Sequence, residues 1–316
     1  MNFEQDVRDE VLKWLPFDRT DLELTAELEA KPTREMLVWF FNWLSRIPHP
    51  HPRQVFRSQE YTFRRLSTRE QVYLARLEDL IESGEYLAPH LSRGIISGYD
   101  GDRNPAQKKN LLRKKSLDLL LNDWGVHHLH LPDVLDSDGF VRRDRSVDED
   151  LLLFVMFRDR QAFLLDVLPH GVWSDDRLVE IAVKNWPDAR LFVELHAFGL
   201  SESCSAADKK KLRAVGVTSA IQIGDKVYMP PKGGISTAGT GAAAAIKANS
   251  LRSELLKVEK GLTDDPAYLR PQIERLGHSF PKNPNYRVLF IRTDFEWMFV
   301  VKESVTGAVF KINTLG

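Results

Sequence analysis

The sequence predicts an α+β protein with a helical N-terminal region, a central mixed or antiparallel sheet flanked by helices, and a C-terminal α+β unit. Two patterns predict this class. Apolar residues recur at helical spacing through residues 1–100, whereas short apolar or alternating runs between turn residues dominate from residue 127 onward. A chain of 316 residues exceeds one typical domain, and turn formers gather in residues 97–105. We therefore expect domains at 1–100, 106–198 and 199–316.

Composition limits the kind of protein this is. The formal net charge is -1, so any attraction to nucleic acid must come from local patches rather than from the whole chain. The single cysteine, Cys204, allows no intramolecular disulfide, which fits a reducing compartment. Residues 1–8 lack the apolar core of a secretory signal, and no run approaches the roughly 18 apolar residues of a membrane span. We expect a cytoplasmic protein without a membrane partner.

Three helices are predicted in the N-terminal region. The first carries an apolar face over residues 3–15, and the second spans Thr33–Ile47 and ends where prolines alternate through residues 48–52. The third begins at Ser67, which is followed three residues later by Glu70 in the pattern of a capping box. Gly84 is typical of the end of that helix.

The middle of the chain alternates between helix and strand. A basic helix over Ala106–Asp123 leads into a histidine-rich strand, and a polar loop over residues 132–150 follows. Two apolar runs, residues 151–157 and 161–168, then predict a hairpin. A further helix begins near residues 174–176 and is ended by Pro187.

The C-terminal part alternates similarly. Ser205 is expected to cap a short helix, and Gly224-Asp225 to form the turn of a tight hairpin over residues 221–229. A helix over Ala242–Lys260 follows. The last predicted elements are three strands: Tyr286–Arg292, Glu296–Lys302 and Val309–Ile312.

A glycine-rich loop, residues 233–241, precedes the helix that begins at Ala242. Such loops can hold phosphates through free backbone N–H groups. A phosphate-binding loop of the P-loop type would need a lysine at its end, and the first lysine here is Lys247. We therefore favour a flexible loop that leads into an alanine-rich helix.

Three of the nine histidines, His127, His128 and His130, fall within four residues of one predicted strand. Alternate side chains of a strand share a face, so His128 and His130 point one way and His127 the other. His170 follows the second strand of the apolar hairpin, which we expect to be a central pair buried on both faces. If the histidine strand lies next to that second strand, His170 approaches His128 and His130. These four histidines are the candidate catalytic residues.

Two kinds of chemistry suit this arrangement. An RNase that forms a cyclic phosphate needs a base, an acid and cations near the phosphate. His127 or His128 could act with His170 as base and acid, without a cofactor. The phosphate and nucleic-acid contacts could come from two basic clusters: Arg113, Lys114, Lys115, and Arg142, Arg143, Arg145.

Alternatively, His128, His130 and His170 could form a three-histidine zinc site, since two histidines separated by one residue on a strand can chelate a metal. It is also possible to read the histidines as structural, with no role beyond hydrogen bonds across the sheet.

The hairpin runs from Leu151 to Leu168, and Pro169-His170 follows it. In this order of elements, residues 106–190 resemble the RelE/HigB-type toxins, small bacterial RNases that cleave mRNA in toxin–antitoxin systems. The resemblance implies a catalytic or phosphate-contacting role for His170. Asp150 stands where such toxins usually open the hairpin with an arginine, and the resemblance covers at most a third of the chain.

The leading functional interpretation is a metal-independent RNase-like bacterial toxin or phage-defence effector that binds and cleaves RNA. It implies a protein partner, either an antitoxin or a subunit of a defence complex. The alternative is a non-catalytic interaction subunit or regulator of a defence system, and the third interpretation is a histidine-based metal-binding protein.

Overall fold

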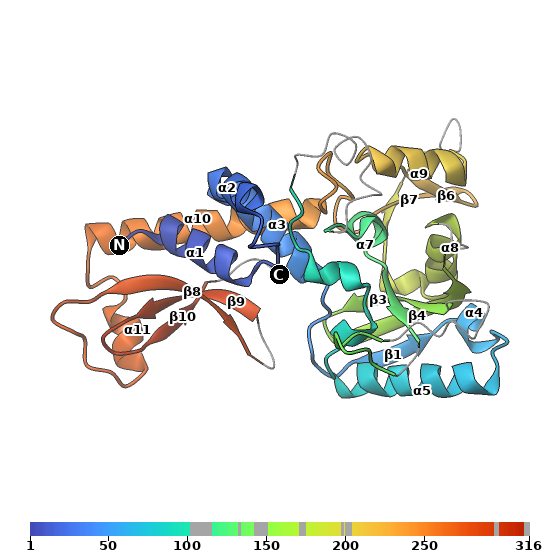
Figure 1. Cartoon of the computed structure of the whole chain (residues 1–316), viewed down its shortest axis with the longest axis horizontal. Coiled ribbons are helices and arrows are strands. Elements are labelled where there is room, and N and C mark those ends of the chain that lie inside the picture. The colour runs from blue at the N-terminus through green and yellow to red at the C-terminus, as the bar shows by residue number, and fades with distance from the viewer. Residues whose placement is uncertain are drawn as a thin grey trace. The chain divides into compact units, whose positions relative to one another are not determined.

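The computed structural model describes residues 1–101, 116–131, 134–141, 151–170, 175–196, 199, 204–293 and 297–312. These residues begin with three helices and end with three strands, and the strands form three small sheets within the described part of the chain (Figure 1). The predicted α+β class is confirmed. No helix among the described residues is long and apolar enough to cross a membrane.

The chain divides into two compact units. Unit 1 contains residues 1–41 and 244–316, and unit 2 contains residues 42–243. These boundaries differ from the three sequence ranges expected above, because the N-terminal helices belong to the same unit as the C-terminal strands. Such an association between distant segments leaves no local pattern in the sequence.

Unit 1 contains a three-stranded antiparallel sheet in the order β10-β9-β8. Its elements are α1 (Phe3–Trp14), α2 (Leu22–Ala30), the first part of α3 (Thr33–Ser45), most of α10 (Ala242–Asp264), α11 (Arg270–Arg275), β8 (Tyr286–Arg292), β9 (Trp297–Glu303) and β10 (Val309–Lys311). Aromatic rings join helix to sheet: Phe40 of α3 packs edge-on against Phe290 at 4.9 Å and Phe299 at 5.6 Å between centroids. The predicted helices and strands of this unit are confirmed within a few residues.

Helix α1 lies beside β8 (Figure 1), and two of its carboxylates bind the outer edge of that strand. The backbone N–H of Val288 donates to Asp6 Oδ2 at 2.8 Å, and that of Phe290 donates to Glu10 Oε2 at 3.1 Å. The two acids are four residues apart and so lie on one face of the helix. Both N–H groups belong to a strand at the edge of the sheet, where they have no partner strand. The two carboxylates supply the hydrogen-bond acceptors that they lack.

Unit 2 contains a four-stranded sheet in the order β1-β4-β3-β2 and a three-stranded sheet in the order β5-β7-β6. Its strands are β1 (Gln54–Arg57), β2 (His127–His130), β3 (Leu151–Arg158), β4 (Gln161–Pro169), β5 (Val193–Leu195), β6 (Ile221–Ile223) and β7 (Lys226–Met229). Its helices are α4 (Gln59–Thr62), α5 (Thr68–Ser83), η1 (Ala88–His90), η2 (Arg93–Ile96), α7 (Leu119–Trp124), α8 (Asp175–Asn185), η4 (Pro187–Ala189) and α9 (Ala206–Ala214).

The hairpin of β3 and β4 forms the centre of the larger sheet. Every residue from Leu152 to Met156 and from Ala162 to Leu168 is buried, which confirms the predicted central pair. β2 pairs antiparallel with β3, and β1 pairs parallel with β4. The presence of β1 corrects the expectation that residues 1–100 are entirely helical. This strand has only four residues, and its parallel partner lies more than 100 residues away. No local sequence pattern therefore indicates it.

A β-bulge interrupts the hairpin between Phe154 and Val155. Phe154 is opposite Asp166, whereas Val155 is opposite Leu164, so Leu165 is the extra residue of β4. Ser58, which caps α4, fixes the bulge: its hydroxyl donates to the Leu165 carbonyl at 2.5 Å. Bulges turn side chains away from simple alternation. Here the bulge places an aspartate beside the apolar cluster that packs against α8.

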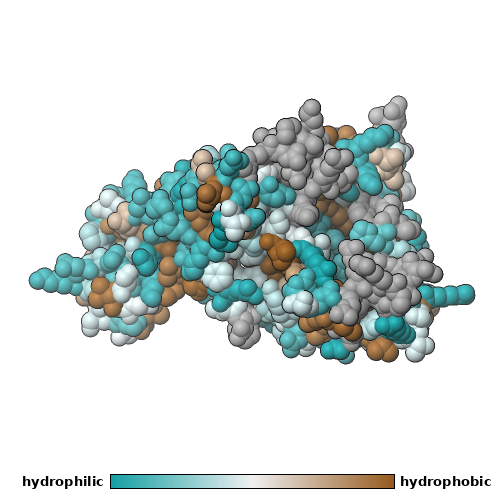
Figure 2. Space-filling model, viewed as in Figure 1, coloured by the Kyte–Doolittle hydropathy of each residue, from teal (hydrophilic) through white to brown (hydrophobic). Residues whose placement is uncertain are grey.

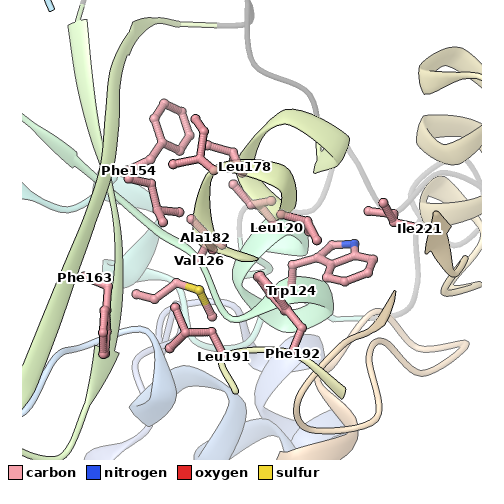
Figure 3. Packing of buried hydrophobic residues seen from close by; sticks show 14 of the residues in the cluster. Leu120, Trp124, Val126, Phe154, Phe163, Leu178, Ala182, Leu191, Phe192 and Ile221 are labelled. Atoms are coloured by element: carbon pink, nitrogen blue, oxygen red, sulfur yellow. The ribbon is translucent and has the colours of Figure 1, made fainter. Parts of the chain in front are cut away.

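That apolar cluster is the core of unit 2. In Figure 3, Phe154 of β3 lies against Leu178 of α8, and Trp124 of α7 faces Phe192. The last two rings meet edge-on at 5.5 Å. One side of the sheet is therefore covered by α7 and α8, which are the helices that carry the polar groups of the candidate site.

The capping predicted for α5 is confirmed. Ser67 accepts from the backbone of Glu70, the Glu70 side chain accepts from the backbone of Ser67, and Gly84 ends the helix with a φ of 81°. A Cβ on Gly84 would lie 2.2 Å from the backbone carbon of His51, so only glycine fits here.

Helix α9 is attached by cations rather than by an apolar stripe. Its buried residues are Lys209 and Arg213, four positions apart. Lys209 pairs with Asp176 of α8, and Arg213 Nε donates to Asp123 Oδ2 of α7 at 2.9 Å. The attachment of α9 therefore depends on the charges of two aspartates.

Candidate active site

The histidine strand, β2, is an edge strand of the four-stranded sheet. His128 and His130 lie on one face with their ring centroids 6.5 Å apart, as the alternation predicts. His127 lies on the other face, where its ring meets the edge of Phe157 at 5.2 Å.

His128 is paired with a carboxylate. Its Nδ1 lies 3.6 Å from Asp118 Oδ2. Asp118 is the N-cap of α7, and its Oδ1 accepts from the backbone N–H of Leu121 at 3.1 Å. The helix thus holds one carboxylate oxygen and leaves the other facing the imidazole. Both side chains are partly exposed, at 20% for His128 and 16% for Asp118, so a substrate can reach the ring.

The backbone of His130 is held by another histidine. Its carbonyl accepts from His90 Nδ1 at 2.8 Å, which requires the proton of His90 to be on that nitrogen. Both histidines are buried. The contact fixes the end of β2 and thereby the spacing between the His128 and His130 rings.

His127 is enclosed. Within the described part of the chain, neither of its ring nitrogens makes a hydrogen bond. Burial dominates, because it penalises the charged ring, and lowers the pKa of His127 to about 4. At neutral pH the ring is therefore uncharged, and it lies on the face of the sheet opposite His128 and His130.

This burial predicts acid-sensitive stability. The unfolded chain binds a proton at His127 near pH 6.5 and the folded chain near pH 4, so the free energy of unfolding falls as pH drops through that window and levels off below it. The expected loss is about 3 kcal/mol. Urea unfolding of wild type and His127→Phe between pH 7.5 and 4 measures it, since the phenylalanine variant lacks this component. Parallel pH curves for the two proteins would contradict the prediction.

His170 is the first residue after β4 and is exposed. Because β2 pairs with β3 and not with β4, a whole strand separates it from the histidine strand. Two inter-strand spacings amount to about 10 Å.

Within the described part of the chain, no group of three or more His, Cys, Asp or Glu side chains is arranged to hold a metal ion.

The six predicted phosphate-binding cations lie outside the described residues: Arg113, Lys114, Lys115, Arg142, Arg143 and Arg145. A different pair of arginines lies on the face of the sheet that carries His128. Asp166, fully buried at the bulge, accepts from Arg64 Nε at 2.9 Å and from Arg177 Nη2 at 3.0 Å. The two arginine side chains are 28% and 47% exposed.

Cross-strand register connects these groups. His128 is opposite Phe154 on β3, and Phe154 is opposite Asp166 on β4. The residues predicted from the sequence did not include Arg64, Arg177 or Asp118. The available signal was Asp166 itself, since a carboxylate within an apolar strand requires charged or hydrogen-bonding partners.

The glycine-rich loop is closed on itself rather than open to an anion. The Gly241 N–H donates to Asn42 Oδ1 at 2.9 Å, and the Ala242 N–H donates to the Gly234 carbonyl at 2.8 Å. A Cβ on Gly234 would lie 2.1 Å from Thr218 Oγ1. The loop leads into a helix as predicted, but these N–H groups have partners within the protein.

Comparisons with protein-family models, with curated proteins and with solved structures gave no match.

Proposed function

We propose that this chain is a metal-independent endoribonuclease whose acid–base residues are on β2. The observation that carries the proposal is the pair of imidazoles, His128 and His130, 6.5 Å apart on one face, with an Asp118 carboxylate oxygen 3.6 Å from the first. Two imidazoles at this spacing can contact different oxygens of one phosphate group. Histidine is the side chain best suited to both proton transfers near neutral pH.

In the proposed reaction, His128 accepts the proton of a ribose 2′-hydroxyl. The 2′-oxygen attacks phosphorus, and the bond to the 5′-oxygen of the next nucleotide breaks. His130 donates a proton to that leaving oxygen, which leaves a 2′,3′-cyclic phosphate and a free 5′-hydroxyl. Asp118 holds the His128 ring and stabilises the imidazolium that forms.

Arg64 and Arg177 are proposed to contact the RNA backbone. Asp166 neutralises one of their two charges, so the cluster keeps a net positive charge on a partly exposed surface. It lies about 10 Å from His128, two strand spacings away, where a neighbouring phosphate can bind. His170, exposed at the end of β4, is proposed as a further phosphate contact.

The biological role proposed with this chemistry is that of a bacterial toxin or phage-defence effector acting on RNA in the cytoplasm. The resemblance of the hairpin region to RelE/HigB-type toxins supports it. Such an activity harms its own cell, so we also propose a protein partner that restrains it, either an antitoxin or a defence-complex subunit.

The test is cleavage of an end-labelled RNA oligonucleotide by the purified full chain. We expect His128→Ala to lower the cleavage rate about a hundredfold or more, because a general base is lost. His196→Ala is the matched control, since that histidine is 84% exposed and outside the site. Cleavage should yield a cyclic phosphate, stop when the 2′-hydroxyl is replaced by hydrogen, and persist with a metal chelator.

Equal cleavage by wild type and His128→Ala, with the variant folded by circular dichroism, would reject the proposed site. Cleavage of neither RNA nor its deoxy counterpart by wild type would shift the assignment to a non-catalytic interaction subunit. Loss of activity only with the chelator would instead favour a metal-dependent reaction.

A further inference from the structure

We propose that unit 1 contains a binding site for an amphipathic carboxylate, a ligand with one carboxylate group and an unbranched apolar tail. A cavity of about 430 Å³ lies between α10, α11, β9 and β10. This volume falls within the range of about 300–1,000 Å³ that is usual for small-molecule sites. The proposal is independent of the histidine site and uses residues of unit 1 alone.

The walls of the cavity are mostly apolar. Val258 comes from α10, Leu269 precedes α11, Val301 comes from β9, and Phe310 from β10. At the mouth, Leu276 and Val309 are 53% and 42% exposed. Figure 2 shows hydrophobic residues scattered among hydrophilic ones on the visible face of the molecule, as is normal for a protein surface. The cavity differs from such scattered residues, because its apolar walls and its exposed apolar rim are contiguous. The apolar tail of one ligand can remove the walls and the rim from water together.

The charges around the cavity select for an anion. Three charged residues line it: Glu254, Arg275 and Lys311. Glu254 is already paired with Lys257, whose Nζ lies 2.6 Å from its Oε1. Arg275 has no ion pair within the described part of the chain and can make paired hydrogen bonds to a carboxylate. The lining therefore has a net positive charge beside an apolar interior.

The first experiment is calorimetric titration of the full chain with sodium decanoate below its micelle concentration. We expect saturable binding of one decanoate per chain. Affinity should rise about tenfold for each two methylenes added from octanoate to dodecanoate, because each buried methylene adds apolar contact. Decylammonium, which has the same tail and the opposite charge, should show no saturable binding.

Variants on α11 separate charge recognition from a general effect on the surface. Arg275→Gln should weaken decanoate binding about tenfold or more, since it removes the guanidinium at the mouth. Arg270→Gln makes the same change on the same helix, but Arg270 lies over the Phe280 ring and does not line the cavity. That control should bind as wild type does.

Three results would overturn the proposal: no saturable binding of decanoate, equal binding of decanoate and decylammonium, or equal affinities for Arg275→Gln and Arg270→Gln. Equal binding of the two amphiphiles would identify the cavity as an unselective apolar surface.

Discussion

Replacing Asp166 with alanine should lower the free energy of unfolding of unit 2 by about 3 kcal/mol. The carboxylate is fully buried and joins three segments, because it accepts from Arg64 after α4 and from Arg177 of α8 while itself lying on β4. Its removal leaves two guanidinium groups without their shared partner and creates a cavity at the bulge. Both arginines are partly exposed and can turn toward water. The loss in free energy of unfolding is therefore expected at the lower end of the range for breaking a buried ion pair.

Urea denaturation monitored by tryptophan fluorescence measures this loss. Asp166→Asn keeps an acceptor for one arginine and should fall between alanine and wild type. The matched control is Asp159→Ala, since that aspartate is 87% exposed in the hairpin turn and should change stability by less than about 0.5 kcal/mol. If Asp166→Ala is as stable as this control, the cluster does not hold the helices on the sheet.

Replacing Arg213 with methionine should lower the free energy of unfolding by about 3–5 kcal/mol, the larger of the two stability effects. The pair that it forms with Asp123 is almost wholly buried, with side-chain exposures of 6% and 2%. Methionine fills much of the space but leaves the aspartate charged in a site closed to water. The hydroxyl of Thr218, which donates to Asp123 Oδ1 at 2.8 Å, compensates only in part.

The double variant Arg213→Met/Asp123→Asn identifies the cause. Because the amide carries no charge, the double variant should recover much of the stability that the single variant loses. Hydrogen exchange should show increased opening of α9 in the single variant and less in the double. If the effects of the two substitutions on the free energy of unfolding are additive, the loss comes from packing and not from the buried charge.

Local patterns predicted the elements of this fold well. The hairpin of β3 and β4, the capping box at Ser67 and the turn at Gly224 are each determined by residues within a few positions of one another. Two features of the fold are non-local and leave no pattern in the sequence. β1 pairs with a strand more than 100 residues away, and the helices of residues 1–41 pack in the same unit as strands after residue 285.

The candidate site was predictable only in part, for the same reason. Alternation along β2 gave the faces of its three histidines, because a strand has a period of two wherever it lies. The neighbour of β2 depends on tertiary pairing, and that pairing places β3 between His170 and the other histidines. Asp118 and Arg64 reach the site from helix ends whose positions no sequence period encodes.

The carboxylates that α1 places on β8 have a consequence for solubility. An uncovered strand edge is a template on which a second molecule can add its own strand, the step that begins ordered aggregation. Burial raises the pKa of Asp6, so this cover takes up a proton at a higher pH than an ordinary aspartate does. We therefore expect self-association in acid to begin at β8. Helix α1 thus protects the protein from aggregation in addition to contributing to the core.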